Sequence, residues 1–232
     1  MLLKHWLLAM MLVAGMAPAR AKASAAVSCA VAGRAAAQLE GLPRNLLLSI
    51  GLVESGRPSP VNGQLQPWPW TVNADGQGQY FPTRAAAEAF VHFAEAAGAR
   101  DIDVGCFQIS LQHHPDAFAS LDEAFDPADN AAYAARFLRR LKSRAGSWVA
   151  AIAAYHSAQP DLGLPYQRRV LAAWRRLGDM PPDLAVAEAV PAGPGTGVIL
   201  QAPEARRVHV YEGSAPANAA WRPGLPQVIG GG

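Results

Sequence analysis

Long apolar segments, metal-binding signatures and nucleophile motifs are all scarce in this 232-residue chain. Beyond its first residues, no segment approaches the roughly 20 apolar residues that a transmembrane helix needs. No His-Glu-x-x-His motif, Gly-x-Ser-x-Gly turn or phosphate-binding glycine loop occurs, which disfavours metal-centred, acyl-transfer and phosphoryl-transfer chemistry. The sequence therefore predicts a chain without stable membrane insertion that works without a metal or another cofactor.

The first 25 residues are typical of a secretory signal peptide. Lys4 and His5 precede an apolar run over residues 7–17, and small-residue cleavage sites follow at 21–25. Cleavage there removes three of the 20 basic residues and none of the 18 acidic ones, which leaves a net charge of −1. That charge gives no reason to expect binding to nucleic acid or to an anionic membrane surface. We expect a periplasmic protein.

Cysteine is almost missing, since the chain holds only Cys29 and Cys106. In an exported chain two cysteines most simply form one disulfide, which would brace the segment around Cys106 against the start of the mature protein. Lipidation of Cys29 is the alternative, but residues 26–28 lie far beyond the apolar run that such a signal would follow.

Periodic structure is concentrated in residues 26–177, the size of one ordinary domain. Residues 57–68 are rich in Pro and Gly and are expected to be loop, whereas 70–81 read as a small β-hairpin. Residues 178–232 shift to Pro, Gly and Ala and are predicted to be a flexible tail, in which 208–211 suggest a strand with no evident partner. The predicted helices cover residues 30–40, 43–54, 83–97, 129–144 and 148–156, with a last helix following Pro165.

Glu54 is the most informative residue, because it is a single acid at the end of an apolar helical run. Leu48 and Leu52 surround it with hydrocarbon, and desolvation favours the protonated carboxyl group. Gly56 ends the helix just beyond, so Glu54 lies near the negative end of the helix dipole. Both effects raise the pKa, as a general acid near neutral pH requires. A solvated Glu in the last helical turn is the simpler alternative.

Three later segments add polar groups that suit a saccharide site. The amide of Gln108 both donates and accepts, so it can bond a sugar hydroxyl or N-acetyl group, or be a satisfied structural Gln. The hydroxyl of Tyr155, at the end of an apolar helix, can hold Glu54 or instead reach a backbone carbonyl. Tyr166 lies near a helix start, where its ring can line a cleft.

Taken together and in this order, these segments resemble the catalytic domain of the soluble lytic transglycosylases, which share a fold with goose-type lysozyme. The family's Glu-Ser signature is matched by Glu54-Ser55, its Gly-Leu-Met-Gln motif by residues 105–108, its Ala-Tyr-Asn-Ala-Gly motif by residues 154–158, and its late tyrosine by Tyr166. The resemblance covers residues 40–177. It implies a mainly α-helical, lysozyme-like domain with a small β-hairpin near the cleft.

The chain departs from the family pattern at two places. The spacing between Glu54 and Gly105 is longer than in compact members, and the excess holds residues 67–70, Pro-Trp-Pro-Trp, and the hairpin. That insertion looks like the one in an exported, proteobacterial-type subgroup with a Gly-Cys-x-Gln variant. His156 and Ser157 replace the usual Asn-Ala, which leaves the sugar contact of that Asn in question.

The resemblance implies cleavage of the β-1,4 bond between N-acetylmuramic acid and N-acetylglucosamine in peptidoglycan. Glu54 would protonate the leaving oxygen and then act as base while the muramic C6 hydroxyl closes on C1, giving a 1,6-anhydro product. A conventional glycosidase needs a second carboxylate about 5–9.5 Å away, whereas this family uses the substrate's N-acetyl group. Asp101 and Asp103 are the nearest second acids, and we expect local structural roles for both.

The remaining site residues are assigned supporting roles. Gln108 and Tyr155 would position substrate and catalyst, Ser55 would hydrogen-bond near the site, and His156 would take the place of the family's Asn. His113 and His114 are adjacent and precede a proline, so we expect a loop in which they point to opposite sides rather than a metal site. Aromatic faces can pack on pyranose rings, and the candidates are Trp70, which we expect to be exposed, Tyr80, Phe107 and Tyr166.

Two rival functions stay open at this stage. One is a non-catalytic glycan-binding or assembly module on the same fold, and the other is a muramidase that uses water. Peptidoglycan strands are the expected partner in each case. A cell-envelope secretion, conjugation, pilus or flagellar machine is a further candidate partner, with the tail as its docking segment.

Overall fold

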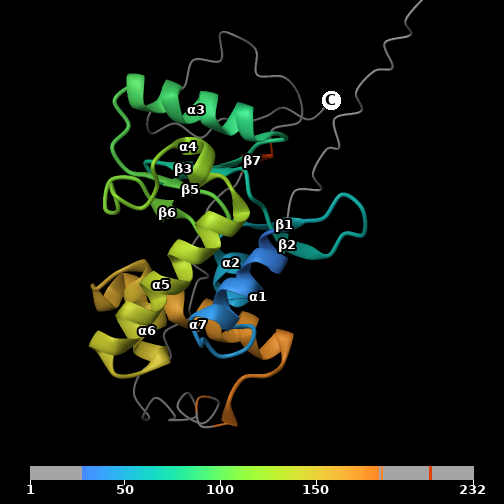
Figure 1. Cartoon of the computed structure of the whole chain (residues 1–232), viewed down its shortest axis with the longest axis vertical. Coiled ribbons are helices and arrows are strands. Elements are labelled where there is room, and N and C mark those ends of the chain that lie inside the picture. Colours follow the sequence, from blue (N-terminus) through green and yellow to red (C-terminus); the bar gives the residue numbers. More distant parts are fainter. Residues whose placement is uncertain (1–27, 183, 185–208, 211–232) are drawn as a thin grey trace, which may run out of the picture.

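A computed structural model of the chain describes residues 28–182, 184 and 209–210 (Figure 1). The predicted signal peptide and most of the predicted tail lie outside these residues. The helices are α1 (Cys29–Leu39), α2 (Leu46–Ser55), α3 (Arg84–Ala96), α4 (Leu121–Ala124), α5 (Pro127–Ala145), α6 (Trp148–His156) and α7 (Pro160–Leu177). The strands are β1 (Gly56–Pro58), β2 (Leu65–Pro67), β3 (Thr71–Ala74), β4 (Gln77–Tyr80), β5 (Ile102–Val104), β6 (Ile109–Ser110) and β7 (His209–Val210).

Local signals place most helix ends where the sequence predicts them. The side chains of Thr83 and Ser147 accept hydrogen bonds from the first turns of α3 and α6. Asp126 caps α5 in the same way with Pro127 in its first turn, so this helix begins two residues before the predicted start. Gly146, at φ 79°, ends it.

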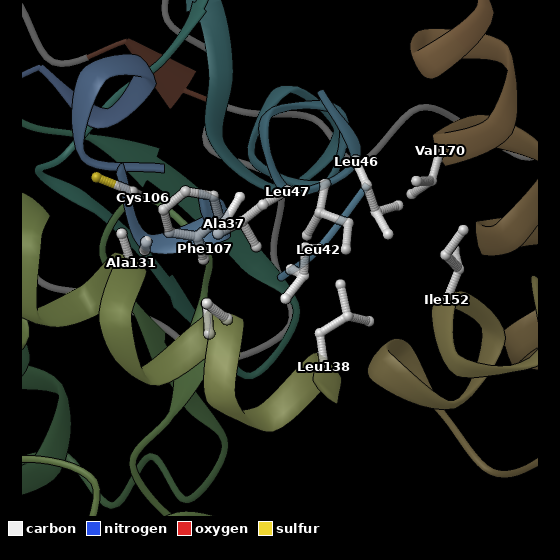
Figure 2. Packing of buried hydrophobic residues seen from close by; sticks show 14 of the residues in the cluster. Ala37, Leu42, Leu46, Leu47, Cys106, Phe107, Ala131, Leu138, Ile152 and Val170 are labelled. Carbon is white, nitrogen blue, oxygen red and sulfur yellow. The ribbon is translucent and has the colours of Figure 1, made fainter. Parts of the chain in front are cut away.

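One half of the domain is helical and is built around α2. Leu46, Leu47 and Ile50 are completely buried there, as expected of a helix that is apolar on all sides. Figure 2 shows Leu46 between Leu138 of α5 and Val170 of α7. Helices α1 and α7 pack directly on α2, and α5 and α6 pack on those two helices in turn (Figure 1), so α2 belongs to one continuous helical core.

The other half is a small sheet covered by α3. Its strand order is β6-β5-β3-β4-β7, and Val72, Val91 and Val104 are fully buried in a second apolar cluster between sheet and helix. The predicted hairpin is confirmed: β3 pairs antiparallel with β4 through a turn at Asp75 and Gly76, both with positive φ. The fold is therefore mainly helical with small antiparallel sheets, as predicted for a lysozyme-like domain.

Phe107 joins the two halves. Its ring is fully buried between α1 and α2, where a Cβ atom added at Gly33 or at Gly51 would lie 2.9 Å from a ring carbon. The predicted disulfide is present beside it, linking Cys29 to Cys106 with a Cα–Cα distance of 5.7 Å. The segment that carries Phe107 is thus fixed to both helices.

Three sequence predictions need correction, and one helix was missed. Helix α7 begins at Pro160, and Pro165 lies inside it, where it removes one backbone hydrogen bond without ending the helix. The predicted loop 57–68 contains β1 and β2, which pair antiparallel. Helix α4 was not predicted. The predicted strand at 208–211 has a partner after all, since His209 and Val210 pair parallel with β4.

None of the helices within the described ranges is long and apolar enough to cross a membrane.

Candidate active site

Glu54 lies in the last turn of α2, two residues before the extended residue Gly56 that ends the helix. The side chain is half-buried and lines a cavity of about 340 Å³ between the helical half and the sheet. The lining residues come from α2, from the segment around β5 and β6, from the turn that follows, and from α5 and α6: Glu54, Asp101, Asp103, Gln108, Ile109, Ser110, His113, His114, Phe137, Ala154, Tyr155 and His156. The structure therefore brings the predicted acid together with three predicted substrate residues, Gln108, Tyr155 and His156.

The end of α2 and the turn 105–108, which together form the floor beneath Glu54, are held by buried hydrogen bonds. Ser55 is fully buried; its hydroxyl donates to the carbonyl oxygen of Cys106 at 2.6 Å and accepts from the backbone N–H of Trp68 at 3.2 Å. Ser55 and Phe107 have no exposed surface. Ser55 therefore hydrogen-bonds beneath the site, as expected, whereas the Phe107 ring does not line the cavity and cannot serve there as a sugar platform. They hold the end of α2 against the turn that contains Gln108.

Asn130 of α5 organises that turn and was missed from the sequence. Its side-chain oxygen accepts from the backbone N–H of Phe107 at 2.9 Å, and its amide nitrogen donates to the carbonyls of Val104 and Ala124. A Cβ at Gly105, where φ is 83°, would collide with this amide, so glycine is required both by the turn and by Asn130. In the sequence, the only sign of the role of Asn130 is that a polar residue lies on the inner face of α5.

Gln108 is itself part of the turn, with φ 47°. Its amide nitrogen donates to the carbonyl oxygens of Gly105 at 2.9 Å and Thr71 at 3.1 Å. The donor side of the amide therefore tethers the turn to β3. Since Gln108 also lines the cavity, the oxygen of the amide is the part that suits a substrate donor.

The two tyrosines exchange the roles that the sequence suggested. The Tyr155 hydroxyl donates to the carbonyl oxygen of Phe107 at 3.0 Å, which is the backbone alternative considered above. Tyr166 is 1 % exposed, and its hydroxyl faces Glu54. Burial first, and the charge of Glu54 second, raise the pKa of both phenols well above 10.

Two further carboxylates face the same cavity. Asp103 is half-buried in β5, and its carboxylate accepts from the side-chain amide of Asn73 at 2.9 Å. Asp101 is exposed, and its backbone N–H bonds the carboxylate of Asp75 in the hairpin turn. Both have the local structural contacts that the sequence predicts for them, and both remain within the cavity wall.

His113 and His114 both line the cavity, so the prediction that they point to opposite sides is wrong. They lie in a turn rather than in extended chain, because Ser110 bonds the backbone N–H groups of both. The Tyr133 hydroxyl bonds Nδ1 of His114 at 2.9 Å, and the ring packs on Phe137. Burial first, and then the neighbouring His113 and Arg140 side chains, lower the pKa of His114. Within the described residues, no group of three or more His, Cys, Asp or Glu is arranged to hold a metal ion.

The aromatic candidates of the insertion lie outside the cavity. Trp70 is half-buried against the second cluster and packs edge-on against Trp68, so the expected exposed platform is not found there. Tyr80 is 5 % exposed, and its hydroxyl donates to the carbonyl of Gly56. Burial, opposed by nearby Arg57, raises the pKa of Tyr80 to about 12. These residues support the end of α2 from the hairpin side.

Comparison with protein families identifies the chain. The model of the transglycosylase SLT domain matches residues 32–163, more than half of the 232 residues. The chain belongs to the transglycosylase SLT domain family. This family is generally one of enzymes that cleave peptidoglycan, so its substrate is glycan strands of the cell wall. The SLT match includes Glu54, Gln108, Tyr155 and His156 and ends three residues before Tyr166. No curated protein and no solved structure matched the chain.

Proposed function

We propose that this protein is a lytic transglycosylase that cleaves the bond between N-acetylmuramic acid and N-acetylglucosamine and releases 1,6-anhydromuramic ends. The observation that carries the proposal is the position of Glu54: a half-buried carboxyl group at the end of a buried helix, in the wall of a cavity, inside an SLT domain. A group placed in this way can transfer a proton to a bound glycosidic oxygen.

Glu54 serves both proton transfers of the reaction. In the first, its proton goes to the leaving oxygen as the bond to C1 breaks. In the second, the carboxylate takes the proton of the C6 hydroxyl while that oxygen bonds C1, so the group ends the cycle protonated as it began. The substrate's own N-acetyl oxygen supports C1 between the two steps. The raised pKa that the sequence predicts for Glu54 stays a prediction.

The residues around Glu54 have different tasks in this proposal. The oxygen of the Gln108 amide and the ring of His156 face the cavity and would contact the saccharide. Tyr166 directs its hydroxyl at the carboxyl group from behind. Tyr155 holds the turn 105–108 by donating a hydrogen bond to the Phe107 carbonyl, and it also lines the cavity.

A hydrolytic muramidase is the second candidate, and one observation favours it: Asp101 and Asp103 lie in the same cavity as Glu54. A carboxylate there could activate a water in an inverting reaction. The bond that the Asn73 side chain donates to Asp103 favours the structural role instead.

Digestion of purified sacculi with mass spectrometry of the products tests the proposal. We expect muropeptides that end in 1,6-anhydromuramic acid, which are lighter by one water than the hydrolysis products. Reducing-end products would establish the muramidase. Binding to sacculi without release of soluble fragments would establish the non-catalytic module.

Export to the periplasm completes the proposal. Residues 1–25 would be the cleaved signal, 26–177 the catalytic domain and 178–232 a tail that links the domain to an envelope-spanning machine. The Cys29–Cys106 disulfide supports an oxidising compartment outside the cytoplasm.

A further inference from the structure

His156, the last residue of α6, is stacked on the ring of Tyr166 in α7. The ring centroids are 4.8 Å apart and the planes differ by 14°. The same imidazole lines the cavity that holds Glu54. His156 therefore lies between the cavity and the tyrosine whose hydroxyl faces the carboxyl group.

The corner that carries His156 is tightly built. A Cβ at Gly163 would lie 2.7 Å from the carbonyl oxygen of Ser157 and 3.0 Å from that of Ala153, so the start of α7 approaches the end of α6 as closely as only glycine allows. The backbone N–H of Ser157 continues the helix by bonding the carbonyl of Ala153. Further along, the Gln167 side chain donates to the carbonyl of Val149 at 2.7 Å. These contacts fix the position of α6 relative to α7.

Tyr166 depends on its neighbours for its orientation. The residue is 1 % exposed, and its hydroxyl has no described partner at ordinary hydrogen-bonding geometry. The ring is instead held by stacking: His156 covers it, Tyr155 lies parallel at 6.5 Å, and the guanidinium of Arg169 is 5.6 Å from its centroid. The imidazole is the nearest of these groups.

We propose that His156 is a positioning residue for Glu54: its ring holds the Tyr166 phenol at the carboxyl group, and uptake of a proton by the ring slows glycan cleavage below neutral pH. The proposal rests on the proposed function. An imidazole changes its charge between pH 5 and 8. A cation at the cavity wall favours the ionised form of a neighbouring carboxyl group, which cannot donate a proton to the leaving oxygen.

Other titratable groups face the same corner, so the assignment must come from position 156 itself. Carboxylates favour proton uptake by the imidazole, and cations oppose it. The groups are Glu54 from α2, Asp101 and Asp103 at β5, His113 and His114 from the turn after β6, Tyr155 from α6, and Tyr166 and Arg169 from α7.

Two substitutions separate the effect of ring stacking on Tyr166 from the effect of the charge on the imidazole. His156→Phe keeps a flat ring on Tyr166 and cannot take up a proton, whereas His156→Ala removes both. We expect His156→Phe to release anhydromuropeptides faster than His156→Ala at pH 8 and to lose the fall in rate between pH 7 and 5. His156→Ala should lower kcat at pH 8 roughly five- to tenfold. His92→Asn, an exposed histidine on α3, is the matched control and should behave as wild type.

If the rate of His156→Phe still fell between pH 7 and 5 as in the wild type, the proposal would be overturned. Equal rates for the Phe and Ala variants at pH 8 would also overturn it. A purely structural residue would lower stability and leave the pH profile unaltered.

A measurement without turnover separates this inference from the proposed function. In Glu54→Gln, NMR can follow the ring carbons of His156 and the hydroxyl-bearing carbon of Tyr166 from pH 5 to 8. We expect the Tyr166 signal to move with the titration of His156 and to stay constant when His156→Phe is added. If the Tyr166 signal stays constant while His156 titrates, the inference is overturned even if sacculi are cleaved. Failure of the wild type to release anhydromuropeptides overturns the proposed function instead.

Discussion

Glu54 and His114 line the same cavity, but the structure holds the two sides in different ways. The floor under Glu54 is tied by a disulfide, by the buried hydroxyl of Ser55 and by the three hydrogen bonds of Asn130. The wall at His114 is a turn held by the bonds that Ser110 accepts, by the bond between His114 and Tyr133, and by ring packing. Glu54, the proposed proton donor, thus lies on a floor fixed by a covalent bond and buried hydrogen bonds, whereas the bonds of the wall lie at exposed or partly buried residues.

Replacing Asn130 should lower the free energy of unfolding more than any change in the wall. Asn130→Ala leaves the backbone N–H of Phe107 and two buried carbonyls without their partner. We expect a loss of about 3–5 kcal/mol in the free energy of unfolding, measured by chemical denaturation. Asn62→Ala, an exposed Asn in the β1–β2 loop, should change it by less than about 0.5 kcal/mol. Similar values for the two variants would show that the floor does not depend on these bonds.

Reduction of the disulfide should have the next largest effect. The bond closes a span of 77 residues, so its loss should lower stability by about 2–4 kcal/mol through the entropy of the unfolded chain. Thermal unfolding with and without dithiothreitol measures the change, and free-thiol titration confirms reduction. An unchanged melting temperature in the fully reduced protein would contradict the role given to this bond.

Much of the fold follows from local signals, and the floor of the site does not. The caps at Thr83 and Ser147 and the Asp75-Gly76 turn could be predicted because each depends on neighbouring residues only. Asn130 could not, since its partners come from β5, α4 and the turn after β5. Pro165 misled the prediction because a proline breaks a helix on average, yet the packing of α7 compensates for one lost bond.

The candidate site divides in the same way. The resemblance placed Gln108, Tyr155 and His156 near Glu54, because the order of motifs carries the fold with it. The exchange of roles between Tyr155 and Tyr166 depends on which hydroxyl reaches which oxygen, and spacing along the chain contains no such information. The exposed Pro-Trp-Pro-Trp loop was wrong for a similar reason: Trp70 packs on a cluster formed by distant segments.

Alkaline pH should probe the floor through its phenols. The pKa values of Tyr155 and Tyr166 are raised well above 10, so the unfolded chain loses these protons first as pH increases. Their contribution to stability is complete below pH 10 and is lost as pH rises toward the pKa values of the folded state. Absorbance at 295 nm should show that these two, and Tyr80 near pH 12, ionise late or only on unfolding. Ionisation of all five tyrosines near pH 10 in the folded protein would contradict this packing.

Changes in the wall at His114 should have the smallest effect on stability. Tyr133→Phe removes one half-buried bond to His114 and should cost about 0.5–1.5 kcal/mol. Because the pKa of His114 is lowered, the folded state favours the neutral ring, and stability should fall as pH drops below about 6.5, the ordinary value. Denaturation at pH 7.5 and 5.0 measures both effects. A larger cost for Tyr133→Phe than for Asn130→Ala would reverse the comparison between wall and floor.

The central claim, that Glu54 alone moves the proton on a floor that others support, is tested most directly by Glu54→Gln. The amide keeps the size of the side chain and removes its proton chemistry. We predict at least about a hundredfold lower release of anhydromuropeptides from sacculi, with a melting temperature within about 2 °C of the wild type. Glu95→Gln, an exposed acid on α3, should alter neither value. Wild-type release by Glu54→Gln would contradict the account.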